Sequence, residues 1–477
     1  MDNLTSTSQN KLLTPLNWKM SILLVVLAVA CFQAAYASIK VPAAGLLLIG
    51  YAYALVCLTD QPTVRRAFYF GLVTGFLCAA PQLFFFWSVF GPPAIVLWIV
   101  FGFWIGLFVA IVCGSIRCWG KTRAMWLIPI IWTGIEYFRS ELYYLKFSWL
   151  NIGYGFPNFS VVPPDVLGMY GIGFIVFLAV SIFFAKPIIQ AFEYVAILLV
   201  LTVFASMWFA FHRVAQERAA SPKITVAGIQ MEFPPVGILP DALDAALKKN
   251  TNAEIFVLSE YTLDGSPPDS LIRWCRKNSR YLVVGGKDYV TNHIYYNTAF
   301  VIGTNGEVVF KQPKSVPIQF FDDGLPAKTQ QVWDSPYGKI GICICYDLSY
   351  TRVTDELIRQ GAQLLIVPTM DVSEWGRHQH ELHSRVAPVR AAEYGVPIFR
   401  LASSGISQAV DGFGNVIMQT HFDKQGEVMS ARFQIPVRGL LPPDRCLSPV
   451  CTGITAVMLA VLLWLNWKER RGKYADY

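Results

Sequence analysis

Charged side chains are scarce in this sequence. Asp, Glu, Lys and Arg together make up 15% of its 477 residues, whereas soluble globular proteins carry about a quarter. Hydrophobic residues make up 54% of the chain. This balance argues against an ordinary soluble protein and predicts a membrane protein.

Paired cysteines and basic clusters are also missing. The ten cysteines contain no Cys-x-x-Cys pair, so they do not form the ligand pattern of a structural metal site or a disulfide framework. The net charge is +7, yet the basic residues are scattered or stand at the ends of apolar runs. We therefore expect no metal, no cofactor and no nucleic-acid partner.

Long apolar runs, by contrast, are plentiful and unevenly distributed. A stretch of about 17–25 apolar residues can cross a bilayer as a helix. The fifth of our candidates is the weakest, because it is short and carries Glu136 beside Arg139. The pattern predicts a transmembrane bundle over 1–212, a catalytic-sized domain over 213–447, and a last span with a basic tail over 448–477. The candidate spans are 20–36, 43–59, 67–89, 92–113, 124–138, 169–186, 193–212 and 448–467.

Basic residues lie mostly on one side of these predicted spans. Lys and Arg are enriched in cytoplasmic loops of membrane proteins. If the N-terminus is cytoplasmic, residues 213–447 lie outside, in the periplasm of a cell with two membranes. The residues then inside are Lys11, Lys19, Arg65, Arg66, Arg117, Lys121, Arg123, Lys186 and the tail 468–473, against Lys40, Arg139 and Lys146 outside.

The segment 213–447 alternates short β-rich runs with helix-like stretches. Near-continuous apolar strands predict sheets covered by other layers, so we expect a layered α/β domain. The predicted strands are 224–229, 255–259, 282–285, 298–302, 308–310, 340–345, 364–367 and 398–401, and the predicted helices are 241–249, 351–360 and 378–394.

Three residues of this domain suit acyl transfer through a thioester. Cys345 follows a buried strand and supplies a nucleophile, which needs a base to form the thiolate. Glu260, at the end of another predicted strand, is the candidate base. Lys314 is the candidate for stabilising the oxyanion, although Lys311 could take its place if a gap is allowed. We expect Cys343 to point to the opposite face from Cys345 and to act as packing only.

The order Glu, Lys, Cys followed by Tyr346 and Asp347 resembles the nitrilase (carbon–nitrogen hydrolase) superfamily. The resemblance runs from about 223 to 416, and includes Lys314 eight residues after Gly306. It implies a four-layer αββα sandwich, with Glu260 as base, Lys314 as the cation and Cys345 as nucleophile, and with Tyr346 beside the oxyanion. It implies no metal, which leaves His378, His380 and His383 without a metal to bind.

The bundle narrows the resemblance to one membrane-bound branch. The series Trp132, Glu136, Arg139, Phe147-Ser-Trp149 and Gly153-Tyr154 is similar to the apolipoprotein N-acyltransferase family. That family implies an enzyme of the bacterial inner membrane that moves an acyl chain from a phospholipid, through a cysteine thioester, to the amine of a diacylglyceryl-cysteine lipoprotein. Glu136 and Arg139 either serve that site or pair with each other.

Two departures from the family pattern concern the substrate. A further functional glutamate of the family falls at Asp322, which we expect to substitute for it, and Asp347 stands where the acyltransferases have glutamate. Both leave open a membrane-tethered amidase that uses water as second nucleophile. Apolar residues near the triad, Phe320, Phe321 and Trp375, are expected to guide acyl chains.

Overall fold

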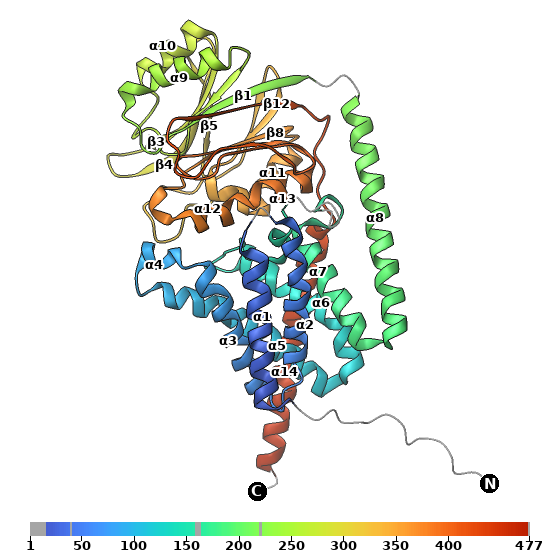
Figure 1. Cartoon of the computed structure of the whole chain (residues 1–477). Helices are drawn as coiled ribbons and strands as arrows, with labels where there is room; N and C mark the ends of the chain where they lie inside the picture. Colours follow the sequence, from blue (N-terminus) through green and yellow to red (C-terminus); the bar gives the residue numbers. More distant parts are fainter. Residues whose placement is uncertain (1–15, 39–40, 158–163, 219–221, 476–477) are drawn as a thin grey trace, which may run out of the picture.

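The computed structural model describes residues 16–38, 41–157, 164–218 and 222–475. Figure 1 shows a helical bundle below a sandwich of two sheets, with the C-terminus at the far end of the bundle. Lys11 and Lys40, which entered the prediction of orientation, lie outside the described residues.

Helices occupy every segment predicted to span the membrane. Among the described residues, five helices are long and apolar enough to cross a bilayer: α1, α5, α7, α8 and α14. In the view of Figure 1, α8 stands beside the bundle. Only 6% of its most apolar stretch is buried. The helices are α1 Trp18–Tyr36, α2 Leu47–Leu58, α3 Val64–Gln82, α4 Phe85–Phe90, α5 Ala94–Trp119, α6 Lys121–Tyr137, α7 Pro164–Ala185, α8 Ile188–Arg218 and α14 Asp444–Ala475.

The predicted third span, 67–89, is not one helix. Helix α3 contains Pro81 and ends at Gln82, and the chain then turns into the short helix α4. In Figure 1, α4 projects from the bundle beneath the sandwich. Hydropathy could not reveal this break, because the apolar run is continuous across it.

Close packing of α3 against α5 depends on glycines. A Cβ on Gly71 would lie 2.8 Å from the Cα of Gly106, and one on Gly75 would lie 2.7 Å from the Cα of Gly102. Small residues allow two membrane helices to approach closely. This contact fixes the start of α5, which forms one wall of the site described below.

The outer domain contains two six-stranded sheets packed face to face. Their strand orders are β12-β1-β2-β3-β4-β5 and β11-β10-β9-β8-β7-β6. Apolar side chains such as Val226, Ile342 and Phe399 fill the space between them. The strands are β1 Lys223–Gln230, β2 Ile255–Val257, β3 Tyr281–Tyr289, β4 Tyr295–Ile302, β5 Val308–Pro313, β6 Val332–Ser335, β7 Gly338–Ile342, β8 Leu364–Thr369, β9 Ile398–Ala402, β10 Gln408–Val410, β11 Val416–Gln419 and β12 Glu427–Gln434.

Helices cover the outer face of each sheet and complete the αββα sandwich. Leu243 and Trp274, from α9 and α10, pack on the first sheet. Val353 and Val389, from α11 and α13, pack on the second sheet in a core that continues into the bundle. The predicted fold class is confirmed, although the predicted helix 378–394 is divided at Arg385. The helices are α9 Leu239–Lys249, α10 Asp269–Asn278, α11 Thr351–Arg359, α12 Arg377–Ser384 and α13 Val386–Tyr394.

Candidate active site

A buried ammonium group joins two carboxylates at the ends of the strands. Lys314 follows β5, and its Nζ lies 2.8 Å from Oε1 of Glu260 and 2.7 Å from Oδ2 of Asp323. All three side chains are buried. The alternative Lys311 points elsewhere, because its Nζ contacts Asp288 at the surface, 2.9 Å away. The structure therefore brings Lys314 to Glu260.

The second carboxylate is Asp323, which corrects the prediction of Asp322. The side chain of Asp322 is exposed, and its backbone carbonyl accepts a hydrogen bond from the Tyr295 hydroxyl at 2.7 Å. Asp323 points inward instead, where its Oδ1 accepts hydrogen bonds from Tyr261 OH at 2.7 Å and from Asn297 Nδ2 at 2.8 Å. The two aspartates are adjacent, so a count along the sequence could not choose between them.

Cys345 lies just beyond its strand rather than at the end of it. Strand β7 ends at Ile342, and Cys345 begins a short 3₁₀ helix, η5 (Cys345–Ser349), with a φ of +51°. Its Sγ is 3.7 Å from the carbonyl oxygen of Met370, whose N–H donates to Oε2 of Glu260 at 2.7 Å. The Cys345 thiol and the Glu260 carboxylate therefore both contact the backbone of Met370.

The change of direction at Cys345 also separates it from Cys343. Residues two apart on a regular strand point to the same face, so the expected separation does not come from alternation. It arises because the chain leaves the strand after Ile342 and adopts the left-handed conformation at Cys345. Cys343 packs with the core that faces α11 and α13, whereas Cys345 packs with the core between the sheets.

Backbone strain is concentrated around these residues. Tyr261, Phe320 and Cys345 have positive φ values of 54°, 70° and 51°. A side chain with a Cβ rarely adopts this region, and such residues cost on the order of 1–3 kcal/mol each unless the surrounding structure holds them. Tyr261 follows Glu260 directly, and Phe320 precedes Asp323 by three residues. The strain thus accompanies three of the residues that carry the site.

The pKa values of the two carboxyl groups move in opposite directions. Burial raises the pKa of Glu260, and the Lys314 ammonium only partly offsets this effect. Burial acts on Asp323 as well, but Lys314 and hydrogen bonds hold its pKa below the usual value. Burial and the charge of Glu260 raise the pKa of Cys345. Such divergence is the pattern expected of a base at Glu260 beside a fixed negative charge at Asp323.

Asp347 connects the turn that contains Cys345 (η5, called the nucleophile turn below) to the segment that follows Lys314. Its carboxylate accepts hydrogen bonds from the N–H groups of Ile344, Ser315 and Val316, at 3.2, 3.0 and 2.7 Å. Burial raises its pKa to about 6. The role of Asp347 is therefore structural. The shorter aspartate in place of the family's glutamate affects the geometry of the turn.

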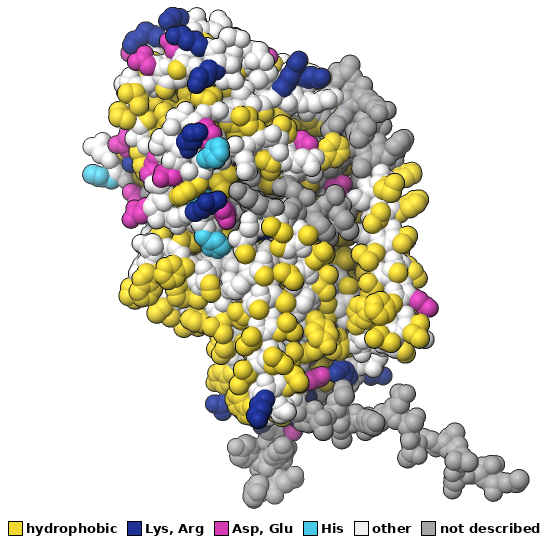
Figure 2. All heavy atoms as spheres, viewed as in Figure 1, with side chains coloured by type: hydrophobic (Ala, Val, Ile, Leu, Met, Phe, Trp, Pro, Cys, Tyr) yellow, Lys and Arg dark blue, Asp and Glu magenta, His cyan; other side chains and the backbone are white. Residues whose placement is uncertain are grey.

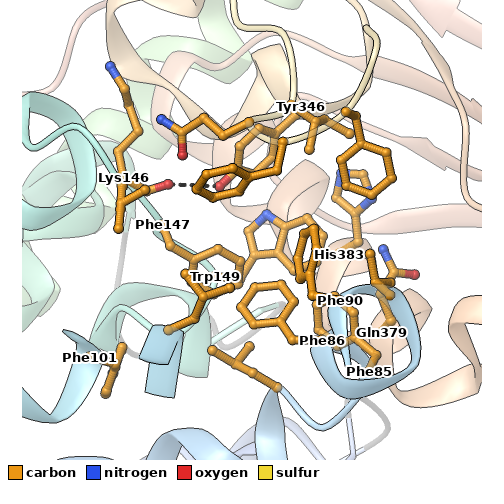
Figure 3. Close-up of a pocket in the computed structure, with 18 of the residues that line it drawn as sticks. Phe85, Phe86, Phe90, Phe101, Lys146, Phe147, Trp149, Tyr346, Gln379 and His383 are labelled. Atoms are coloured by element: carbon orange, nitrogen blue, oxygen red, sulfur yellow. Dashed lines mark hydrogen bonds between the residues drawn. The ribbon is translucent and has the colours of Figure 1, made fainter. Parts of the chain in front are cut away.

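Cys345 opens into a cavity shared by the bundle and the outer domain. Its walls come from α4, α5, the segment 145–149, the segment 318–321 and α12 (Figure 3). The predicted residues Phe320, Phe321, Tyr346 and Trp375 all line it. Most of the remaining wall is apolar, and consists of Leu83, Phe85, Phe86, Val89, Phe90, Leu97, Val100, Phe101, Trp104, Leu145, Phe147, Trp149 and Ile318, with Arg139, Lys146, Gln319, Asp371, Gln379 and His383 as polar members.

The bundle holds the nucleophile turn directly. The carbonyl oxygen of Lys146 accepts hydrogen bonds from the hydroxyls of Tyr346 and Tyr350, at 3.1 and 3.2 Å, and the first of these is drawn in Figure 3. Trp149 Nε1 donates to the Ser349 hydroxyl at 3.0 Å. These contacts hold Tyr346 and the residues that follow it, up to Tyr350.

Arg139 serves the segment that leads to the cavity more than it serves Glu136. Its guanidinium donates to the Phe147 carbonyl oxygen at 3.0 Å and to Asn151 Oδ1 at 2.6 Å, whereas Glu136 Oε1 is 3.9 Å away. The pairing considered from sequence is present but long. Arg139 thereby orients the 147–151 segment below the nucleophile.

The three histidines of 378–383 form no metal site among the described residues, although Nδ1 of His380 and Nδ1 of His383 both face Asp371, at 3.8 and 2.8 Å. His378 contacts Gln82 of α3 at 2.8 Å, His380 packs against Phe422, and His383 stacks on Trp149. Sequence reasoning missed the roles of His383, Asn297 and Met370 in the site. Asn297 lies within β4, and nothing in its sequence context distinguishes it from any other inward-facing strand residue.

Comparison with known families supports the division seen in the structure. Residues 26–182 match the apolipoprotein N-acyltransferase N-terminal domain, and residues 229–439 match the carbon-nitrogen hydrolase family. The chain is 25% identical over 431 residues to an apolipoprotein N-acyltransferase of Geobacter metallireducens, covering 76% of this chain and 80% of that protein. It is also 25% identical over 366 residues to one of Rhizobium rhizogenes, covering 62% and 65%.

Other relatives match a shorter part of the chain. A deaminated glutathione amidase of Dictyostelium discoideum is 29% identical over 147 residues, covering 26% of this chain and 50% of that protein. Among solved structures, a carbon-nitrogen hydrolase from Helicobacter pylori is 18% identical with a TM-score of 0.40, covering 44% of this chain and 89% of that one.

Proposed function

This chain belongs to the apolipoprotein N-acyltransferase family, the membrane-bound branch of the carbon–nitrogen hydrolases, and from this premise we propose how it works. It is a membrane enzyme that N-acylates lipoproteins. The acyl chain passes from a phospholipid to Cys345, and then to the N-terminal amine of a diacylglyceryl-cysteine lipoprotein.

The observation that carries this proposal is the position of Cys345 in an aromatic cavity formed partly by the membrane bundle. Phe85, Phe86 and Phe90 of α4 and Phe101 of α5 line that cavity (Figure 3). A cavity of this kind suits an acyl chain that enters from the bilayer. It also supports transfer over hydrolysis, because a thioester in a dry, apolar site is protected from water.

The first half-reaction forms the thioester. Glu260 accepts the proton of Cys345, and the thiolate attacks the ester carbonyl carbon of the phospholipid. Lys314 and the N–H of Tyr346 stabilise the tetrahedral oxyanion. The C–O bond then breaks, the leaving oxygen takes the proton from Glu260, and a lysophospholipid departs.

The second half-reaction forms the amide. The lipoprotein amine attacks the thioester carbon, Glu260 accepts its proton, and the C–S bond breaks to release Cys345. Asp323 holds Lys314 in place throughout, since its charge stays fixed beside the ammonium. We also propose that the outer domain is periplasmic. This orientation is supported by basic residues at the far end of the bundle, where Figure 2 displays a group of basic side chains. Arg117 and Lys121 bond to Pro62 and Asp60, between α2 and α3, and Arg66 bonds to the carbonyl oxygen of Leu16, before α1.

Mass spectrometry of the enzyme incubated with phospholipid alone tests this function. We expect one acyl group on the peptide containing Cys345, and its release as an amide when a diacylglyceryl-cysteine peptide is added. Cys345→Ala should carry no acyl group, whereas Cys343→Ala should load normally and cost about 1 kcal/mol of packing. Rapid release of free fatty acid without acceptor, or ammonia from small amides, would instead establish the amidase alternative.

A further inference from the structure

His383 is a buried group in the cavity wall that the mechanism above does not use. It comes from α12 and is 1% exposed. Its ring stacks on Trp149, with centroids 4.5 Å apart and an interplanar angle of 18°. Figure 3 shows His383 on the wall beside Trp149 and Gln379. His383 is thus a buried polar ring in a wall that is mostly apolar.

Asp371 determines which nitrogen of this ring carries the proton. Nδ1 of His383 is 2.8 Å from Oδ1 of Asp371, and Arg400 donates to the other carboxylate oxygen. Arg400 NH2 also approaches Nδ1, at 2.9 Å. Arg400 can only donate, but it is already bound to Asp371, and an unprotonated Nδ1 would set its lone pair 2.8 Å from a carboxylate oxygen. We therefore assign the hydrogen to Nδ1, which leaves Nε2 as an acceptor. Burial lowers the pKa of His383 to about 4, which keeps the ring neutral at neutral pH.

The Nε2 acceptor is buried and has no hydrogen-bond partner among the described residues. A buried polar atom without a partner is costly, and it points to a missing group. Because the ring lines the cavity, a bound substrate with an N–H can supply that group.

Two series of contacts connect His383 to the surroundings of Cys345. On one side, Asp371 follows Met370, whose carbonyl oxygen is 3.7 Å from Cys345 Sγ. On the other, the Trp149 ring lies 5.9 Å from the ring of Tyr346, the residue next to Cys345. The imidazole therefore belongs to the wall that surrounds the reacting atoms.

We propose that Nε2 of His383 accepts a hydrogen bond from the amine that attacks the thioester, and so binds the acyl acceptor. This inference rests on the proposed function. The reacting part of the acyl donor, an ester and a hydrocarbon chain, offers no N–H, whereas the acceptor must bring one. When the C–N bond forms and the C–S bond breaks, the amine proton passes to Glu260 and then to the Cys345 thiolate. His383 stays neutral and orients the nitrogen.

Single-turnover discharge of the acyl-enzyme tests this role. Wild type, His383→Phe and His383→Gln are loaded with phosphatidylglycerol, whose head group has no N–H, and then mixed with a diacylglyceryl-cysteine peptide or with 2-mercaptoethanol, a nucleophile that brings no N–H. Phe keeps a ring against Trp149 but lacks the acceptor, and Gln keeps an acceptor. The matched control is His380→Phe, on the same helix and equally buried but outside the cavity lining.

We expect His383→Phe to slow discharge by the peptide at least tenfold and to raise the peptide concentration for half-maximal rate. Discharge of the same variant by 2-mercaptoethanol should stay within about twofold of wild type, and His383→Gln should recover most of the peptide rate. Because both discharge rates are measured on the same protein, their ratio does not depend on any loss of folded protein. If the Phe variant does not load, His383→Leu takes its place.

Two results would overturn the inference while the proposed function stands. One is unchanged discharge by the peptide in His383→Phe, and the other is an equal slowing with peptide and 2-mercaptoethanol. A wild-type enzyme that never forms a thioester would instead overturn the proposed function, and this inference with it.

Discussion

Two adjacent carboxylates, Asp322 and Asp323, differ completely in environment. Only Asp323 contacts the buried Lys314. Removing one member of a buried ion pair costs about 3–5 kcal/mol, so Asp323→Asn should lower the melting temperature and reduce thioester formation at least tenfold. Asp322→Asn should leave the melting temperature unchanged and the rate of thioester formation within about twofold of wild type. Thermal unfolding and the rate of acyl loading check this; an inactive Asp322 variant beside an active Asp323 variant would contradict the geometry.

His383 should give the protein a pH-dependent stability. Its pKa is about 4 in the folded state and about 6.5 in the unfolded chain. Between these values the unfolded state binds more protons, so stability is fully present above pH 6.5 and is lost as the pH falls towards 4. At about 1.4 kcal/mol per pKa unit, the loss is about 3 kcal/mol. Unfolding in detergent at pH 7 and pH 4 measures it.

The control for this pH effect is His383→Phe, which carries no proton at this position. Its loss of stability between pH 7 and pH 4 should be smaller than that of wild type by about the same 3 kcal/mol. Equal losses in the two proteins would mean that other groups account for the acid sensitivity.

Some residues of the site could be predicted from sequence, and others could not. Glu260, Lys314 and Cys345 follow predicted strands in a characteristic order, so their proximity was expected. Asp323 was missed because it stands next to Asp322, and a count along the sequence cannot tell which of two neighbours points inward. Asn297 was missed because it lies within a strand, where its contacts depend on the loops that close over the end of the sheet.

At the level of elements, helices were easier to predict than edge strands. Strand β12 escaped notice because polar residues separate Met429, Ala431 and Phe433, which are the ones that it buries. That period of two is a strand signal, but it is weaker than a continuous apolar run. The break between α3 and α4 has no such signal, since hydropathy measures apolar length and not direction.

Helix α4 contributes one side chain that joins the bundle to the outer domain. The ring of Phe90 lies 6.0 Å from that of Phe320 and 5.7 Å from that of Phe321. Each aromatic pair is worth about 0.5–1.5 kcal/mol, so Phe90→Ala should reduce kcat/KM for long-chain phospholipid about tenfold. Trp87→Ala, on the same helix but outside the cavity lining, should have a small effect. A larger defect in the Trp87 variant would count against a role for this wall.

Over the whole molecule, the basic residues at the far end of the bundle predict its orientation. A reporter fused after residue 213 should be active only outside the cytoplasm, and one fused after Lys473 only inside it. Alkaline phosphatase and a fluorescent protein provide the two readouts. Both fusions on the same side would mean that α14 does not cross the membrane.

The hydrogen bonds from Lys146 to Tyr346 and Tyr350 have a consequence for biosynthesis. The carbonyl group that holds the nucleophile turn is translated about 200 residues before the turn itself. A ribosome therefore completes α1 to α8 before the outer domain, with α14 following last, and the outer domain acquires its full set of contacts only by docking back onto helices made earlier. On the proposed function, the turn that carries the nucleophile is thus fully supported only in the membrane-bound enzyme, and a detached outer domain would lack that support.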